Sequence, residues 1–439
     1  MSYLLRHLRV TLPAVITTLL FALPSIPLPS MAADILVANA RLVTGTRQGI
    51  LTGASLLVRD GRIVSIVAQG RPKGMAADAE VVNVDGAYVT AGFFDSSTTV
   101  GLLEVGGGID NRDYELRGTD MGAGFQVSLG LNRFSSLIPM MRVQGVTRAL
   151  VRPNAKSSNM AGQSAIIGLA GKPGMIMRDN NAVFVDLTEK ASQFSGGSRS
   201  KAITDLLDAL DEAALYSNNT AAYQSGDLRE LRQSERDLKA LLPIIQGVKP
   251  LAIHVDRAAD IETILRQLDP YHLKLIVIGG REAWKVTPIL VAQKIPVIIN
   301  PMDNLPSSFD QIGARLDNAA LLVEAGVMVA FMTEDVFTES RSLTQGAGVA
   351  VAYGLAWQDA VNAMTINPAM IWGVDKAYGA LAPGRVADVL VWDGDPLEVT
   401  SRPTKIMIDG EWMSLETRQT LLRDRYADLD KGNTTFGYR

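Results

Sequence analysis

Apolar and polar residues alternate along short stretches near both ends of the chain. This period of two is typical of half-buried β-strands, because neighbouring side chains on a strand point to opposite faces. Four Asp-Gly pairs, which begin at Asp60, Asp85, Asp393 and Asp409, lie between or beside these stretches and predict tight hairpin turns. The stretches with this pattern are residues 35–43, 55–67, 80–92, 386–399 and 404–415. Since both ends share the pattern, we expect one composite β-sandwich domain from residues 34–91 and 378–416.

The middle of the chain, residues 92–377, alternates apolar strand-like segments with longer helix-like ones. Such alternation is typical of parallel β/α units, and eight strand-like segments are the number that closes a (β/α)8 TIM-like barrel. The segments are FFDSSTTV, TRALVRP, SAIIGLAG, AVFVDLT, PLAIHVD, KLIVIGG, PVIINP and VMVAFMTED. We therefore expect an α/β fold in which a barrel is inserted into the composite β-sandwich. An open flavodoxin-like sheet is the alternative, and it seldom combines eight parallel strands with a split β-domain.

Two segments between the predicted strands carry apolar residues at spacings of three and four. They are residues 200–216 and 228–245, and this spacing predicts amphipathic helices. Residues 417–439 are expected to add a C-terminal helix and a tail.

The first 33 residues have the pattern of an export signal. Arg6 and Arg9 precede an apolar core at residues 10–23, and Ser30-Met31-Ala32 supplies small residues at a cleavage site. Several prolines interrupt the apolar run, which favours a cleaved signal over a retained membrane anchor. The chain has no cysteine, which excludes disulfides and thiolate chemistry. We expect a periplasmic protein with no stable membrane span after cleavage.

Composition excludes some classes of partner. With 47% hydrophobic and 20% charged residues, the chain has the composition of an ordinary globular protein. Its formal net charge is −4, and it contains no run of basic residues. We therefore expect no nucleic-acid partner.

Three motifs resemble those of a known group of enzymes. They are DGRIVSIV followed by DGAYVTAGFFD, in which Ala91 replaces a usual proline; WQDAVNAMTINPAMIWGV; and YGALAPGRVADVLVWDGDPLEV. With these motifs the chain resembles the amidohydrolase superfamily, most closely its imidazolonepropionase-like branch. In that family they lead into the first barrel strand, form the last barrel helix and return the chain to the β-domain.

The resemblance implies hydrolysis of carbon–nitrogen bonds other than peptide bonds, often in cyclic amides. The family uses one or two divalent metal ions, which turn water into hydroxide and polarise the substrate. Its first barrel strand normally supplies two histidines one residue apart, and Ser97 and Thr99 stand in those places here. Neutral hydroxyl groups are poor zinc ligands. We therefore expect a degenerate zinc site, and interpret Ser97 and Thr99 as candidate substrate-binding residues.

By the same resemblance, other strand ends keep part of the family's chemistry. His254 stands where the family has a metal-binding histidine, whereas Gly279 and Gly280 replace the next one. The eighth strand should end in an aspartate that binds metal or acts as a general base, and the pattern leaves Glu334 and Asp335 open for that role. His254, Glu334 and Asp335 are thus the candidate catalytic residues, and His254 and Asp335 are the remnant candidates for metal binding.

Acidic residues suggest a further kind of site. Asp186 ends the fourth predicted strand, where related enzymes often carry a modified lysine or a glutamate, and it is a third candidate substrate-binding residue. A site rich in oxygen ligands suits magnesium, manganese or calcium better than zinc. The residues available for such a site are Asp95, Asp186, Glu334, Asp335 and His254.

Two hypotheses of function follow. The first is an exported hydrolase with an altered, metal-poor site in which His254 and Glu334 or Asp335 perform acid–base chemistry. The second is a non-catalytic barrel, a pseudoenzyme, that binds a small ligand or a partner protein with the same mouth. In both, the expected partner is a small molecule, and formation of a homo-oligomer stays open.

Overall fold

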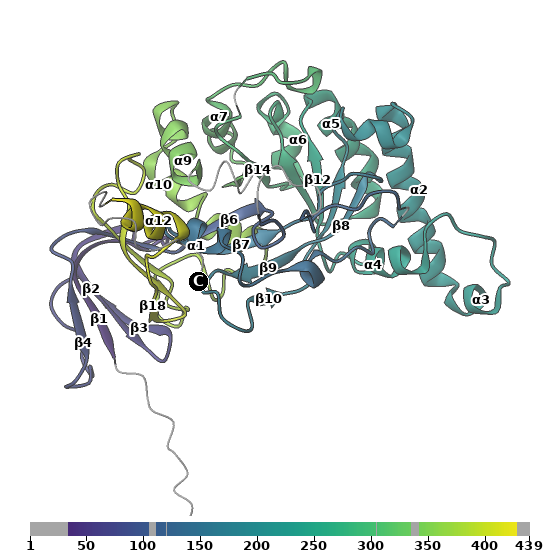
Figure 1. Cartoon of the computed structure of the whole chain (residues 1–439). Helices are drawn as coiled ribbons and strands as arrows, with labels where there is room; N and C mark the ends of the chain where they lie inside the picture. The colour runs from purple at the N-terminus through teal and green to yellow at the C-terminus, as the bar shows by residue number, and fades with distance from the viewer. Residues whose placement is uncertain (1–33, 105–110, 120, 304, 335–341, 428–439) are drawn as a thin grey trace, which may run out of the picture. The chain divides into compact units, whose positions relative to one another are not determined.

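The computed structural model describes residues 34–104, 111–119, 121–303, 305–334 and 342–427. Its strands form three hydrogen-bonded sheets, of eight, four and six strands. Figure 1 shows the purple strands of the N-terminal region in the same part of the fold as the yellow strand β18 (Glu411–Trp412), whereas the teal and green middle of the chain holds most of the helices.

The eight-stranded sheet combines strands from both ends of the chain. They meet at the antiparallel pair β5–β16, where Thr90 lies opposite Leu390. The strands that precede the middle region are β1 (Ile35–Val43), β2 (Ile50–Arg59), β3 (Arg62–Val67), β4 (Glu80–Asn83) and β5 (Tyr88–Ala91). Those that follow it are β16 (Val389–Trp392), β17 (Pro403–Ile408) and β18. Hydrogen bonds join all of these strands into one sheet. The expected domain boundaries stay a prediction.

Two of the four Asp-Gly pairs form the predicted hairpins. The pair at Asp60 joins β2 to β3 and the pair at Asp409 joins β17 to β18, with positive φ at both residues of each pair. The prediction is wrong for the other two. At Asp85 the chain passes from β4 to β5, which both run parallel to β1, so it continues along β1 instead of turning back. At Asp393 a longer loop begins, which ends at β17.

Each of the eight predicted strand segments in the middle contains a strand. Two of them, β6 and β7, pair in parallel, and five others, β11 to β15, form an uninterrupted parallel series. The bounds are β6 (Phe93–Thr98), β7 (Val146–Val151), β9 (Ala165–Gly168), β11 (Val183–Asp186), β12 (Leu251–Val255), β13 (Leu275–Gly279), β14 (Val297–Ile299) and β15 (Val329–Phe331).

The third predicted strand does not run parallel to its neighbours. The predicted segment, residues 164–171, contains β9, and a strand that was not predicted, β8 (Met160–Gln163), directly precedes it. β9 pairs antiparallel with β7, β8 pairs antiparallel with β11, and β10 (Ile176–Arg178) pairs antiparallel with β9. The prediction of eight parallel strands is therefore wrong for the third segment.

The two sheets of the middle region do not close into one hydrogen-bonded cylinder within the described residues. The four-stranded order is β10-β9-β7-β6, and the six-stranded order is β15-β14-β13-β12-β11-β8. At the seam between β15 and β6, the Asp95 carboxylate accepts a hydrogen bond from the Thr333 backbone at 3.1 Å. Phe94 and Phe331 donate instead to the backbone carbonyls of Met364 and Ala363. Hydrogen bonds that involve a side chain and a loop therefore connect the two sheets at this seam. The predicted barrel has backbone hydrogen bonds between two neighbouring strands there.

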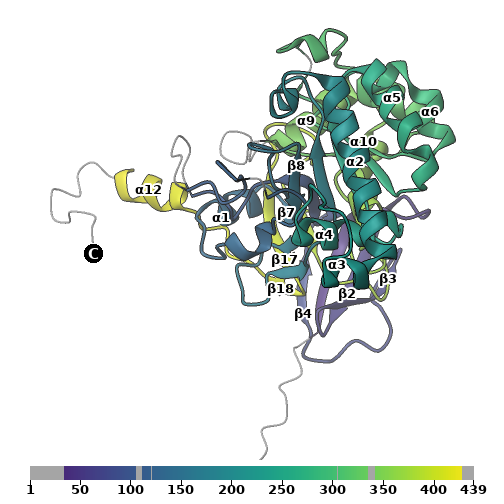
Figure 2. The same ribbon diagram turned by 90° about the vertical axis from the view of Figure 1, so that its right-hand side faces the viewer.

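The predicted amphipathic helices are present with altered bounds. The first is α2 (Arg199–Asn218), and the second, α4 (Glu235–Ile245), begins late because the Ser234 hydroxyl caps it by accepting from the Asp237 N–H at 3.2 Å. Figure 2 shows α2, α5 and α6 on the same side of the strands. The other helices are α1 (Leu137–Arg142), α3 (Thr220–Ser225), α5 (Ala258–Leu268), α6 (Thr287–Ala292), α7 (Asn318–Glu324), α9 (Ser342–Ala352), α10 (Trp357–Asn362), α11 (Ile366–Ile371) and α12 (Arg418–Tyr426).

The expected last barrel helix is two short helices, α10 and α11. Pro368 lies in the first turn of α11, where its missing N–H has no partner to lose. In a continuous helix Pro368 could not donate to the carbonyl one turn earlier, so the proline favours a break between α10 and α11. Among the described helices, none has the length and apolar character that crossing a membrane requires.

Alternation along the parallel strands separates two apolar layers. On β12, Leu251, Ile253 and Val255 pack in the large cluster that includes residues of α2, α4 and α5, whereas Ala252 packs in a second, smaller cluster. This second cluster lies on the inner face of the strands and includes Trp372, whose ring stacks on Phe184 with centroids 6.1 Å apart. Since side chains alternate, the inner cluster determines which residues face inward at the strand ends.

Candidate active site

Polar side chains continue the inner apolar layer at the carboxyl ends of the strands. Each of them follows, two residues later, a member of the inner cluster, so both project to the same side. The pairs are Leu150 with Arg152, Phe184 with Asp186, Ala252 with His254, Ile298 with Asn300, and Met332 with Glu334. The carboxyl ends of parallel strands are where α/β enzymes place their catalytic groups. We define these five polar residues as the inner polar layer.

His254 and Asp186 form a pair within this layer. They lie opposite each other in the parallel register of β11 and β12, and Nδ1 of His254 is 3.7 Å from Oδ2 of Asp186. The other carboxylate oxygen accepts from the Thr188 hydroxyl at 2.7 Å and from its N–H at 3.0 Å. Burial raises the pKa of Asp186, but His254 and Thr188 lower it more, to about 2. Asp186 is therefore ionised across the physiological range.

The second ring nitrogen of His254 has no hydrogen-bond partner among the described residues. Nε2 is buried, and a Cβ at Gly279 would lie 3.0 Å from it. Burial lowers the pKa of His254, but the charges of Asp186, Asp256 and Glu334 outweigh burial and raise it above 6.5. An imidazole held on one side by a carboxylate and unsatisfied on the other can give or take a proton at Nε2.

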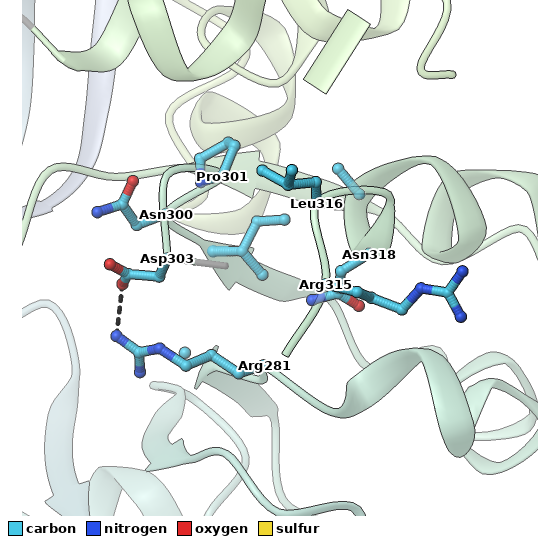
Figure 3. Close-up of a pocket in the computed structure, with 10 residues that line it drawn as sticks. Arg281, Asn300, Pro301, Asp303, Arg315, Leu316 and Asn318 are labelled. Carbon is cyan, nitrogen blue, oxygen red and sulfur yellow. Dashed lines mark hydrogen bonds and ion pairs between the residues drawn. The ribbon is translucent and has the colours of Figure 1, made fainter. Parts of the chain in front are cut away.

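Glu334 faces a different partner, the guanidinium of Arg281. Nη2 of Arg281 lies 3.4 Å from Oε1 of Glu334, Nη1 lies 2.8 Å from Oδ2 of Asp256, and Asp303 forms a third ion pair. Figure 3 shows Arg281 reaching towards Asp303, whereas the Arg315 guanidinium points away. Burial raises the pKa of Glu334, but Arg281, His254 and Arg152 lower it below its ordinary value. Glu334 is thus an ionised partner of Arg281 more than a free base.

The space beside this ion-pair cluster is small. A cavity of about 10 Å³, enough for a single water molecule, is lined by Arg281, Asp303 and Asn300 and by the nearby loop at Arg315. Asp335, the other candidate for the general base, lies outside the described residues.

Arg152 is a member of the inner polar layer that the sequence motifs did not reveal. It directly follows β7, its backbone N–H donates to Thr98, and its Nη1 contacts the Asn154 side chain. Nε is buried and has no hydrogen-bond partner among the described residues. Burial lowers the pKa of Arg152, opposed by Glu334, Asp186 and Asp95, which are its acidic neighbours. Its position two residues after the apolar Leu150 was the available signal.

Ser97 and Thr99 are buried near the end of β6. Ser97 is fully buried, and its hydroxyl has no hydrogen-bond partner among the described residues. Asp95 accepts from the Ser97 N–H at 3.1 Å and also binds the hydroxyl of Thr333. The interactions of the described residues do not join Ser97 or Thr99 to His254. Their assignment to substrate binding stays a prediction.

The donor set does not fit the zinc site that the fold family implies. Within the described ranges, no three His, Cys, Asp or Glu side chains are grouped so that they could hold a metal ion. Asp95 is tied to Thr333, Asp186 to His254, and Glu334 to Arg281. The same ties count against the alternative cluster of oxygen ligands for magnesium, manganese or calcium, as far as its described members go. The guanidinium of Arg152, itself a cation, instead interacts electrostatically with Glu334, Asp186 and Asp95.

Comparison with known proteins shows similarity to amidohydrolases. Residues 206–414 match the amidohydrolase family model. The chain is 19% identical over 385 residues to amidohydrolase tasK of Hapsidospora irregularis, a match that covers 81% of this chain but 39% of that protein. It is 42% identical over 65 residues to imidazolonepropionase of Chromobacterium violaceum, which covers 14% of this chain and 16% of that protein. The chain thus spans less than half the length of either relative.

Solved structures show the same fold. An amidohydrolase from Thermotoga maritima has a TM-score of 0.77 and 23% identity, covering 87% of this chain and 99% of that one. Molinate hydrolase has a TM-score of 0.55 and 14% identity, covering 93% of this chain and 99% of that one. Residues 206–414 thus match the amidohydrolase family model, and the chain has the fold of solved amidohydrolases.

Proposed function

We propose that this protein hydrolyses a carbon–nitrogen bond other than a peptide bond, such as that of a cyclic amide, with His254 in place of the family's zinc. The observation that carries the proposal is the His254–Asp186 pair, whose Nε2 is buried without a partner on the inner side of the strand ends. The hydrolase relatives and the superfamily fold support the reaction class.

The proposed reaction uses only water as co-reactant. Water attacks the carbonyl carbon while neutral His254 accepts its proton at Nε2, and Asp186 stabilises the imidazolium that forms. The imidazolium then returns the proton to the nitrogen as the carbon–nitrogen bond breaks. In a cyclic amide, the new acid and amine stay in one opened product. The unsatisfied Nε–H of Arg152 supplies a donor for negative charge that develops on the carbonyl oxygen.

The second candidate function is binding without catalysis. It is favoured by the Arg281 cluster, in which Asp256, Asp303 and Glu334 are all ion-paired and none is left to activate water. It is also favoured by Ser97 and Thr99, which by the resemblance take the places of two histidines of the family.

The two candidates are separated by one set of assays on the chain from residue 34. A panel of five- and six-membered cyclic amides is followed by mass spectrometry, with chelator or with added zinc or manganese. We expect turnover that survives chelation, falls by about 10²–10⁴-fold in His254→Gln, and is unchanged in the matched control His272→Gln. Turnover that depends on metal contradicts the proposed mechanism. Saturable binding without turnover establishes the second candidate.

We also propose that the protein is exported to the periplasm and that the signal at residues 1–33 is removed. The proposal rests on the basic start, apolar core and small cleavage residues of that segment. N-terminal sequencing of the fractionated protein should give a first residue at or next to Asp34, and full-length chain in the membrane fraction would contradict cleavage.

A further inference from the structure

A second concave site lies at the opposite ends of the parallel strands. Its lining includes residues that directly precede the strands, namely Pro250 before β12, Lys274 before β13, Pro296 before β14 and Met328 before β15. These are amino ends, whereas the inner polar layer follows the carboxyl ends. The volume of this basal groove is about 980 Å³. That is at the upper end of the range for small-molecule sites, roughly 300–1,000 Å³.

The interior of the basal groove is apolar. Trp372 and Ile276 line it and belong to the inner cluster, with 2% and 3% of their surfaces exposed. Val291, Met328 and Met370 also line it, and they expose 41%, 37% and 45% of their surfaces to solvent. Large apolar side chains that stay exposed around a concavity mark a binding site more often than an ordinary surface.

The rim of the basal groove is basic. Lys249, Lys274, Lys294 and Arg178 line it, with Asp179 as the acidic residue among the lining side chains. Arg178 is committed to the carbonyls of Trp372 and Gly373, at 3.2 and 3.0 Å. Lys249 is half-buried, forms no ion pair with a described residue within 4.0 Å, and has a pKa lowered by that burial despite the charge of Asp179. An anionic group beside Lys249 would offset the free-energy cost of burying its ammonium group.

We propose that the basal groove binds a small amphiphilic anion, a carboxylate with an apolar chain, whose head pairs with Lys249 and whose chain lies over Trp372. The volume, the apolar interior and the excess positive charge at the rim all fit this ligand class. A neutral apolar ligand would leave Lys249 without a counter-ion. The site is separate from His254 and does not depend on the proposed hydrolysis.

The test uses sodium decanoate as the probe and the chain from residue 34. Decanoate is titrated by calorimetry and by tryptophan fluorescence, with decanol as the neutral counterpart. We expect one saturable site, a fluorescence change that disappears in Trp372→Phe, and affinity about tenfold weaker in Lys249→Gln. Lys239→Gln is the matched control, because Lys239 pairs with Glu235 on α4 and does not line the groove. His254→Gln should bind decanoate normally.

Val291→Glu provides a second variant, because it adds a negative charge at the exposed wall and should abolish decanoate binding without touching the core. Absence of saturable decanoate binding, equal affinity for decanol, or binding unaffected by both Lys249→Gln and Val291→Glu each overturns the proposal. Analytical ultracentrifugation tests a further alternative. A dimer that persists with decanoate but dissociates in Val291→Glu would show that a second copy of the chain occupies the groove, and would overturn the proposal.

Discussion

At the scale of single residues, the electrostatics of His254 show two effects of opposite sign on one imidazole. Burial disfavours its charged form, while Asp186, Asp256 and Glu334 favour it, and the carboxylates prevail. The sequence singled out His254 and Asp186 separately, one as catalytic and one as substrate-binding. Their pairing across adjacent strands could not be predicted, because it depends on the register between β11 and β12.

Asp186→Asn should reverse the balance at His254. With the nearest negative charge removed, burial is opposed less strongly, and the pKa of His254 should fall. The measurement is a proton NMR titration of the ring signals, and His272, which is exposed, serves as an internal reference. A pKa of His254 that is unchanged in Asp186→Asn would show that the two side chains are not coupled.

The same pair predicts how stability depends on pH. The pKa of His254 is raised, so its contribution is fully present below its ordinary value of 6.5 and is lost as pH rises through the folded-state pKa. The pKa of Asp186 is lowered to about 2, so its contribution is present above 3.8 and is lost as pH falls towards 2. The difference in unfolding free energy between wild type and Asp186→Asn should therefore shrink at both extremes, as urea titrations can measure.

At the scale of elements, one buried arginine links β7 to the terminal sheet. Arg148 forms a bidentate ion pair with Asp388 at 2.6 and 2.8 Å and a second ion pair with Asp409 at 2.6 Å. Its side chain is 4% exposed, and Gly168 on β9 leaves room for it, because a Cβ there would lie 2.6 Å from Nη1. None of these partners is near in sequence, so no local pattern predicts the contact.

Arg148→Met should destabilise the protein by about 3 kcal/mol or more, because it leaves Asp388 buried without its counter-ion. The double variant Arg148→Met with Asp388→Leu should recover much of the loss. Lys201→Met is the matched control, since Lys201 pairs with Asp205 on the surface and should cost under about 1 kcal/mol. Urea unfolding measures all three. If the single and double variants lose equal stability, the ion pair is not the cause.

At the scale of the whole molecule, the two ends of the chain depend on each other. β5 has β1 on one side and β16 on the other, so the strands before residue 92 are completed only by strands after residue 388. The basal groove and the inner polar layer lie at opposite ends of the same parallel strands, which separates the proposed binding of an amphiphilic anion from the proposed hydrolysis.

A chain that ends at Tyr378 should therefore lose cooperative unfolding, because β5 keeps an unpaired edge and Arg148 loses Asp388. A chain that ends at Glu416 is the control, since it keeps β16 to β18 and removes α12, which has no buried residue. Near-ultraviolet circular dichroism during urea titration compares the two. A cooperative transition in the shorter chain would show that the N-terminal strands are stable without their C-terminal partners.

The sequence alone determined which segments become strands, except β8 and β10, where the amphipathic helices lie, and which family the motifs resemble. These are local properties, because side-chain periodicity and turn chemistry act over a few residues. The tertiary structure alone decided the antiparallel third strand, the seam between β15 and β6, and the placement of Arg152 near Glu334, Asp186 and Asp95. Those features depend on chain connections and on contacts between distant residues, which form only when the strands pack together.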